Sequence, residues 1–267
     1  MSVVRVFAAA LVISASLAAQ TLVVQPAKAE KTTETRTLPL AAGSVLKVKN
    51  VNGFIHLEAW DQAEVQFAGD FKPSSQDEQV KVVIETIKGG LEIRGEYPKH
   101  SGPGSYRGPQ CQMTLKVPRR VAPTLETVNG DVSIEGIEGR TVVNSVNGGI
   151  SASRLSECLK AETVNGSITL DQVKGGLGLE TVNGTIKGTG LDGLGQGIKV
   201  DTVNGSIHLQ LGGLKGHLKA STVNGGISFQ AKGADQVEVR KHRVTAVFPG
   251  SEQTFEIATV NGSIKLY

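Results

Sequence analysis

The sequence predicts an all-β protein, namely a parallel β-solenoid (β-helix-like) of about twelve coils of about 18 residues each. One observation is a repeat: Val-Asn-Gly occurs eight times, and the central copies follow one another after 18, 18, 18, 21 and 20 residues. The other is that apolar and polar residues alternate around each copy, whereas no stretch after the N-terminal region has a helical period. The valines of the eight copies are Val51, Val128, Val146, Val164, Val182, Val203, Val223 and Val260.

Each repeat is expected to contain two half-buried strands. The residue three positions before the valine is apolar, and the residue four positions after it is Ile or Val. The position directly before the valine is Thr or Ser in the seven copies from Thr127 to Thr259. Such alternation is typical of strands with one face in a core. A second turn, such as Lys174-Gly175-Gly176, then closes the unit.

A stack of antiparallel hairpins fits the same alternation, with Asn-Gly as a two-residue turn. The solenoid explains better why each column keeps one residue type, because like residues then stack about 4.8 Å apart. The outer gaps between copies are 77 and 37 residues, close to multiples of the repeat. We therefore expect degenerate coils in these gaps, one at Glu85–Leu91 and another around Val237 and Val239.

The Asn-Gly pairs are interpreted as structural turns and not as ligand contacts. Both residue types tolerate positive φ, and asparagine side chains can hydrogen-bond along a stack. The predicted turn residues are Asn129, Gly130, Asn147, Gly148, Asn165, Gly166, Asn183, Gly184, Asn204, Gly205, Asn224 and Gly225.

The N-terminus is typical of a secretory signal peptide over residues 1–29. Arg5 precedes an apolar run, and Ala27-Lys28-Ala29 fits the cleavage rule, so we expect cleavage before Glu30. The alternative is an uncleaved transmembrane anchor, but polar residues dilute the run. The product is expected to be periplasmic or extracellular, associated with the cell envelope, and not membrane-spanning once cleaved.

The mature chain is divided into a linker at 30–44 and a repeat domain at 45–267, with an irregular loop at 96–110. Cleavage removes two of the 28 basic residues and none of the 25 acidic ones, so the formal charge becomes 26 − 25 = +1. This near-neutral charge does not favour nucleic acid as a partner. Cys111 is in phase with a core face and Cys158 is not, so a disulfide between them is not expected.

Two groups of residues are candidate binding sites. Glu162, Glu180 and Asp201 stand two positions before the valine in successive coils, where they could approach a divalent cation or a sugar. The alternative is that these acids form an exposed polar stripe without a binding role, partly neutralised by Lys187 and His208 across the turn. We expect no metal, because calcium requires more oxygen ligands from a curved loop.

The second group lies in the loop that interrupts the repeat. Tyr97, His100, Tyr106 and Arg107 suit contact with sugar or peptide, although a Gly/Pro-rich insertion without a binding role is the alternative. A short basic cluster at Arg240–Arg243 is equally ambiguous, since it could contact an acidic polymer or discourage strand addition at an edge.

The segment Leu115-Lys116-Val117-Pro118-Arg119, followed by Leu125–Val132 with its Thr-Val-Asn-Gly-Asp-Val pattern, resembles the bacterial putative-adhesin family of β-strand-repeat envelope proteins. The resemblance covers about Val45 to Tyr267. It implies a solenoid-like fold, an envelope or extracellular location and no established catalysis. It supplies no catalytic residue. The uniform Val-Asn-Gly and the loop after Glu96 depart from the family pattern.

Two functions remain open on the sequence. The first is a non-enzymatic exported scaffold with adhesin-like surface binding, whose partner is an envelope polysaccharide, an envelope protein or a second copy of the chain. The second is a polysaccharide-acting β-helix enzyme that uses the acidic column. The chain has no nucleophile elbow, phosphate-binding loop or dinucleotide fingerprint, so neither catalysis by such a motif nor a cofactor is expected.

Overall fold

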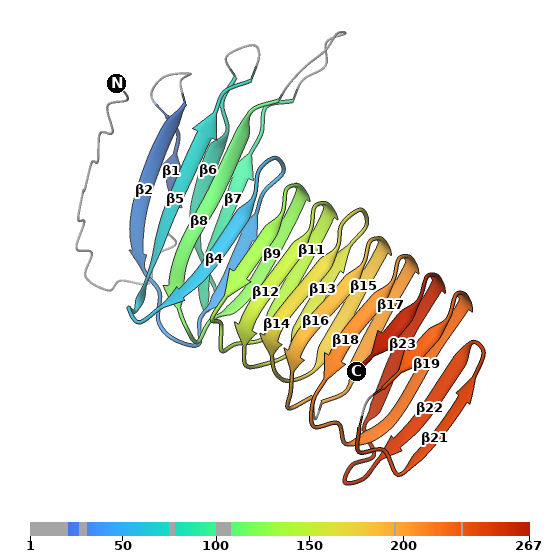
Figure 1. The fold of residues 1–267 in the computed structure, drawn as a ribbon. Helices are drawn as coiled ribbons and strands as arrows, with labels where there is room; N and C mark the ends of the chain where they lie inside the picture. The colour runs from blue at the N-terminus through green and yellow to red at the C-terminus, as the bar shows by residue number, and fades with distance from the viewer. Residues whose placement is uncertain (1–20, 27–30, 75–77, 100–107, 195, 231) are drawn as a thin grey trace, which may run out of the picture.

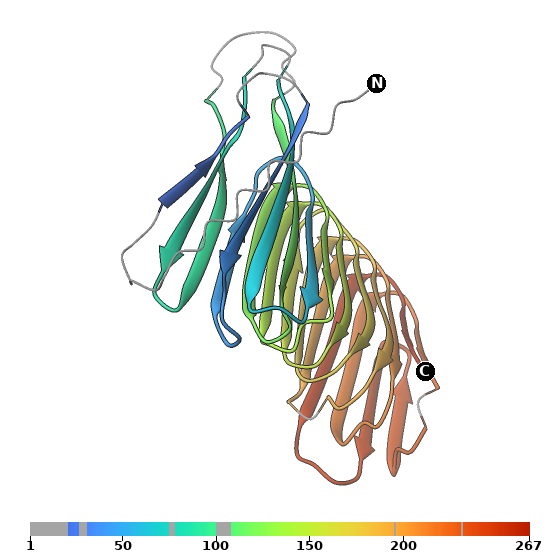
Figure 2. The same ribbon diagram turned by 90° about the vertical axis from the view of Figure 1, so that its left-hand side faces the viewer.

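In the computed structural model the chain forms two β-sheets that face each other as layers. The structure describes residues 21–26, 31–74, 78–99, 108–194, 196–230 and 232–267. Within these residues there are 24 strands and no helix. We call the 13-stranded sheet, from β1 to β21, sheet A and the 11-stranded sheet, from β2 to β20, sheet B. Figure 1 shows the strands side by side along the molecule, and Figure 2 shows the two layers from the side.

The repeat builds a solenoid in which every coil gives one strand to each sheet. The described residues form nine such coils. Their strand pairs are β3–β4 (Val45–Lys49, Ile55–Trp60), β7–β8 (Gly90–Glu96, Gln110–Pro118), β9–β10 (Ala122–Asn129, Val132–Glu135), β11–β12 (Thr141–Asn147, Ile150–Leu155), β13–β14 (Leu159–Thr163, Ile168–Val173), β15–β16 (Leu177–Asn183, Ile186–Leu191), β17–β18 (Ile198–Asn204, Ile207–Leu211), β19–β20 (Gly216–Asn224, Ile227–Phe229) and β23–β24 (Thr254–Asn261, Ile264–Leu266).

Neighbouring coils pair in parallel and place equivalent repeat positions side by side. Thr163, for example, lies opposite Thr181, and Ile168 lies opposite Ile186. This register confirms the solenoid for the repeat and excludes the stack of antiparallel hairpins there. The apolar columns of both sheets point inward and are buried, as the alternation predicts: Leu125, Val143, Ala161, Leu179 and Val200 on sheet A face Val132, Ile150, Ile168, Ile186 and Ile207 on sheet B.

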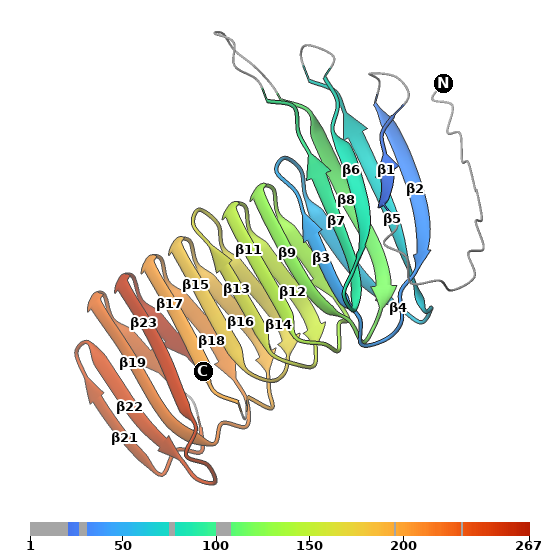
Figure 3. The same ribbon diagram turned by 180° about the vertical axis from the view of Figure 1, so that it is seen from behind.

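The coils do not stack in chain order at the ends. Near the N-terminus, β3 lies between β7 and β9, so the first coil is one place inside the end. Near the C-terminus, β23 lies between β17 and β19, so the last coil is likewise one place inside. Figures 1 and 3 show β23 in this position from opposite sides. The gaps of 77 and 37 residues arise because these coils leave and re-enter the stack.

Antiparallel strands outside the coils explain why there are nine coils and not about twelve. Beyond β7 and β8 lie β1 (Thr21–Val24), β6 (Lys81–Ile87), β2 (Thr32–Pro39) and β5 (Glu64–Lys72), and beyond β19 lie β22 (Arg243–Phe248) and β21 (Gln236–Arg240). The predicted degenerate coil at Glu85–Leu91 is wrong, because β6 and β7 form an antiparallel hairpin. The one predicted around Val237 and Val239 is wrong for the same reason, since β21 pairs with β22.

The segment predicted as a linker at 30–44 contributes a strand instead. Thr32–Pro39 pairs along its whole length with β5, and its alternation of half-buried and exposed residues shows why it can lie on a sheet edge. The signal peptide at 1–29 stays a prediction. Four of its residues, Thr21–Val24, pair with β6 as β1, and Val24 is fully buried. Cleavage before Glu30 would therefore remove a strand from the edge of sheet A.

The glycine of Val-Asn-Gly is required by close backbone approach and not by the positive φ that the turn interpretation supposed. In the six copies from Gly130 to Gly225, neither the Asn nor the Gly has positive φ. A Cβ atom on Gly184 would lie only 1.9 Å from the carbonyl oxygen of Gly166 in the neighbouring coil. The other turn does use positive φ, with Gly175 at 88°, as the Lys174-Gly175-Gly176 pattern predicts.

The asparagines form one hydrogen-bonded ladder along the solenoid, as expected from their side chains. From Asn129 onward, each Nδ2 donates to the Oδ1 of the asparagine before it in the stack at 2.8–2.9 Å. The ladder follows the spatial order and not the chain order, through Asn52, Asn129, Asn147, Asn165, Asn183, Asn204, Asn261 and Asn224.

The threonine column lies on the buried side of the same turn. Thr181 Oγ1 donates to the Gly166 carbonyl at 2.9 Å, and Thr163 and Thr259 make the equivalent bond. In the first coil Asn50 takes the threonine position, and its Nδ2 donates to Gly53 O at 3.1 Å. Thr127, which follows in space, has no hydrogen-bond partner for its buried Oγ1. Each letter of Thr-Val-Asn-Gly thus has a separate role, and only the valine is left for the outer surface.

Candidate functional site

A groove of about 1120 Å³ runs across the outer face of sheet A, from β11 to the turn between β21 and β22. We call it the sheet A groove. The valine column lines one side of it, and these valines are the most regular exposed apolar residues of the chain. Their exposed fractions are 40% at Val164, 39% at Val182, 41% at Val203, 40% at Val260 and 63% at Val223. Contiguous apolar surface of this kind marks a binding face more often than scattered single residues do.

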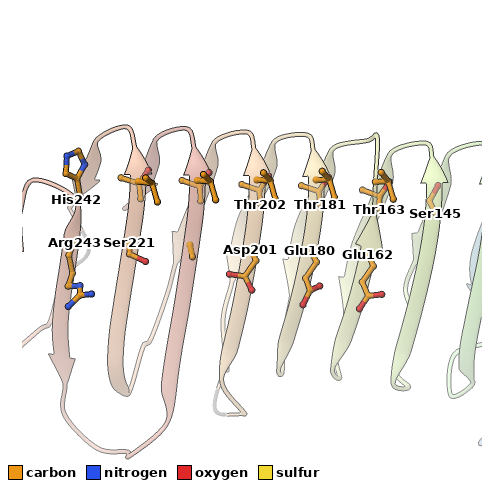
Figure 4. A pocket seen from close by; sticks show the side chains of 18 of the residues that line it. Ser145, Glu162, Thr163, Glu180, Thr181, Asp201, Thr202, Ser221, His242 and Arg243 are labelled. Atoms are coloured by element: carbon orange, nitrogen blue, oxygen red, sulfur yellow. The ribbon is translucent and has the colours of Figure 1, made fainter.

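The three predicted acidic residues lie on the floor of this groove. Glu162, Glu180 and Asp201 are cross-strand neighbours on β13, β15 and β17, and Figure 4 shows their carboxylates in one row beside the threonines. The row continues in space to Ala258 and Ser221, because β23 is inserted before β19. The acidic column is therefore three residues long at this point.

Lysines on the same face pair with the acidic column. Lys160 Nζ lies 2.6 Å from Glu162 Oε1, and Lys199 Nζ lies 3.4 Å from both Glu180 Oε1 and Asp201 Oδ2. Hydrogen bonds to these carboxylates raise the pKa of both lysines. The expected neutralisation by Lys187 and His208 across the turn is wrong, because those two residues lie on the outer face of sheet B.

A basic turn closes one end of the groove. His242 and Arg243 connect β21 to β22, and Arg243 lies opposite Ser221 in the row that holds the acids. His242 lies against β19, with its carbonyl accepting from Thr222 N at 3.1 Å. The ambiguous cluster Arg240–Arg243 is thus placed at a groove end, where it lines the cavity with positive charge.

Tyr97 of the predicted loop group and the acidic column are not brought together. Tyr97 follows β7, and its hydroxyl donates to Asn50 Oδ1 and to the Asn52 carbonyl oxygen, the latter at 2.9 Å. Burial raises the pKa of Tyr97, so the hydroxyl keeps its proton at neutral pH. Its hydrogen bonds therefore hold the first Asn-Gly turn in place. His100, Tyr106 and Arg107 lie outside the described residues. β7 ends at Glu96 and β8 begins at Gln110, which are the bounds of the expected loop.

Neither a metal centre nor a catalytic acid pair emerges from the acidic column. Across the part of the chain that the structure describes, no group of three His, Cys, Asp or Glu side chains is arranged to hold a metal ion. Glycosidases need a carboxyl group kept protonated by an apolar site or a close second carboxylate. Glu162 and Glu180 are cross-strand neighbours, but they are 37% and 48% exposed and paired with lysines, so neither lies in an apolar site.

The two cysteines are free thiols in the structure. Cys111 lies on the buried face of β8, where burial raises the pKa of its thiol to about 12. Cys158 precedes β13 and contacts Gln196, with Sγ 2.6 Å from Oε1. A thiol with so high a pKa is not a nucleophile at neutral pH, which leaves Cys111 as a core residue.

Sequence reasoning missed a row of cations on the opposite face. Lys187, His208 and Lys265 are direct cross-strand neighbours on β16, β18 and β24 of sheet B. The signal was available in part, since all three stand five positions after a Val-Asn-Gly valine. Their adjacency was not available, because Lys265 reaches His208 only through the insertion of the last coil.

Comparison with known proteins identifies the family. A family model described as Toastrack DUF4097 matches residues 121–267, and no curated protein matches. A putative adhesin from Bacteroides fragilis is similar at 12% identity and a TM-score of 0.44, with 90% of this chain and 99% of that one covered. A putative cell adhesion protein from Clostridium sporogenes is similar at 11% identity and a TM-score of 0.41, with 88% and 99% covered.

A third solved structure, a putative adhesin from Parabacteroides distasonis, is 14% identical with a TM-score of 0.42, over 90% of this chain and 99% of that one. In the described residues no helix is long and apolar enough to cross a membrane. The family match spans more than half of the chain, from the β9–β10 coil to the last residue. This protein therefore belongs to the Toastrack DUF4097 family, whose fold is solenoid-like and all-β.

Proposed function

We propose that this protein is a non-enzymatic, exported scaffold of the envelope or extracellular space that binds a partner along the sheet A groove, an adhesin-like role. The observation that carries the proposal is the exposed valine column, which runs unbroken beside a polar row for several coils. A partner in extended conformation fits a groove built from a repeat, because each coil offers it the same contacts. The valines, the acids and the basic end favour a polypeptide segment with apolar and charged side chains.

The test is a comparison of binding between two triple variants and the native chain. Val164→Thr, Val182→Thr and Val203→Thr remove apolar surface from the groove with little change of shape or strand propensity. Ser133→Ala, Ser151→Ala and Thr169→Ser alter three positions on the other sheet's outer face as a control. Each protein is screened against purified envelope proteins, envelope polysaccharides and a glycan array.

Capture of an envelope component by the native chain and the control, with loss of capture in the valine variant, is the expected result. Failure of every envelope component to bind, or equal binding by both variants, would contradict the proposal. Export is tested separately, by cell fractionation and by the mass of the mature N-terminus. A chain that keeps residues 1–29 in the cytoplasmic fraction would refute the exported location.

A further inference from the structure

We propose that the outer face of sheet B carries a second binding site, for an anionic polysaccharide, centred on the cation row Lys187, His208 and Lys265. The three side chains lie in one register on adjacent coils, which are about 4.8 Å apart in a β-sheet. The row therefore spans roughly 10 Å along the solenoid axis. It lies on the sheet opposite the sheet A groove and is independent of that groove's function.

The row is unfavourable without a ligand. Two lysines flank one histidine here, and like charges directly opposite each other on neighbouring strands destabilise a sheet when that histidine is protonated. Burial and the two lysines lower the pKa of His208. The described part of the chain places no carboxylate oxygen within 4.0 Å of either lysine amine, in contrast to Lys160 and Lys199 on sheet A. Anionic groups supplied from outside would relieve this repulsion.

The surroundings of the row favour a polysaccharide. A parallel column of hydroxyl groups lies directly before β16, β18 and β24, two positions earlier than the row: Thr185, Ser206 and Ser263. Ser206 Oγ lies 3.2 Å from Ser263 Oγ. Tyr267, at 47% exposure, stands two positions beyond Lys265. Hydroxyl groups and one aromatic ring suit hydrogen bonding and stacking with sugars.

Other polyanions fit this face less well. Residues at the centre of the row alternate with buried Ile207 and Leu209, so no large aliphatic side chain projects outward to enter a lipid bilayer. Nucleic acid is bound by a stronger positive field and by several stacking aromatics. The net charge of the whole chain is only +3, with three tyrosines and one tryptophan.

His208 makes the proposed binding dependent on pH. The groups that face it are Lys187 on β16 and Lys265 on β24, with Ser206 directly before its own strand and Gln210 on that strand. Asp171 of β14, a carboxylate on the strand beyond Lys187, accepts from Thr189 Oγ1 at 2.9 Å. A bound anion stabilises protonated histidine, so affinity should rise as the pH falls below the ordinary pKa of histidine.

The experiment measures binding of the purified full chain to immobilised dextran sulfate, with neutral dextran as the reference. Lys187→Gln with Lys265→Gln removes two charges from the row. Lys160→Gln with Lys199→Gln removes the same two charges from sheet A and is the matched control. We expect at least a tenfold loss of affinity in the row variant, equivalent to at least about 1.4 kcal/mol, and less than about a twofold loss in the control.

The pH response supplies a second readout. Native protein should bind dextran sulfate several-fold more tightly at about pH 5.5 than at about pH 7.5, and His208→Gln should bind with little pH dependence. Equal losses in the two lysine variants would overturn the proposal, because net charge alone would then explain binding. Binding to vesicles of phosphatidylserine and phosphatidylcholine or to single-stranded DNA, with none to dextran sulfate, would overturn it as well.

Discussion

The interior of the solenoid and its two ends differ in how the spatial order of the coils relates to their order in the chain. From β9 to β18 each coil follows its predecessor in space as in sequence, and every sheet contact is between parallel neighbours. At each end the terminal coil of the repeat is displaced inward by one place, and antiparallel strands extend both sheets at the N-terminal end and sheet A at the C-terminal end. An open stack of identical coils would expose unpaired strand edges at both ends. Strands that are far apart in the sequence therefore pair at the ends, whereas successive repeats pair in the interior.

Deletion of coils should show the largest difference between the two regions. Removal of residues 254–267 takes out β23 and β24, so β17 and β19 lose the neighbour that they share. We expect loss of hydrogen-exchange protection throughout β19, β21 and β22, with protection retained from β9 to β14. Removal of residues 165–182, one whole interior repeat, joins Val164 to Asn183 in register and should leave a folded protein.

This pair of deletions can also break the comparison. If the interior deletion abolishes the cooperative unfolding transition while the smaller C-terminal one leaves it intact, the interior coils are not interchangeable. Unfolding by denaturant, followed by circular dichroism, decides between the two results.

A glycine pair gives the next largest effect and concerns the close approach of coils. Gly184→Ala would place a Cβ atom 1.9 Å from the Gly166 carbonyl oxygen, so the coils must separate locally. We expect the free energy of unfolding to fall by about 2–4 kcal/mol. Gly226→Ala is the control, since no heavy atom lies within 4 Å of its new Cβ, and should change stability by about 0.5 kcal/mol or less. Equal losses of stability in the two variants would show that close approach to the neighbouring coil is not the reason for glycine at position 184.

The smallest expected difference between the interior and the end concerns one hydrogen bond of the threonine column. Thr181→Val in the interior removes a donor from the Gly166 carbonyl and should cost about 1–2 kcal/mol. Thr127→Val, beside the displaced first coil, replaces a buried hydroxyl that has no partner, so it should be neutral or slightly stabilising. Thermal unfolding of both variants measures the difference. A larger loss at Thr127 than at Thr181 would contradict the hydrogen-bond assignment.

The sequence was sufficient to predict the repeat, the inward apolar columns and the asparagine ladder. The columns depend on alternation within one coil, and the ladder depends on equivalent positions of neighbouring coils lying side by side. It was misleading for the Asn-Gly turn. Glycine is needed both where φ is positive and where two backbones approach closely, so its presence does not distinguish the two. The positions of β3 and β23 could not be predicted, because a displaced coil and a sequential coil have the same local pattern. For this reason the acidic column was found from sequence, whereas the row that ends in Lys265 was not.

Because the displaced terminal coils form the ends of the solenoid, the number of interior repeats can change without any change at the ends. An added interior repeat needs only equivalent neighbours on its two sides, and neither end has to be rebuilt. Gene duplication within residues 128–203 would lengthen the sheet A groove by about 4.8 Å per unit, while both terminal arrangements stay unchanged. Three consecutive intervals of 18 residues lie in this region, and the reach of the protein toward an extended partner can thus evolve in fixed steps.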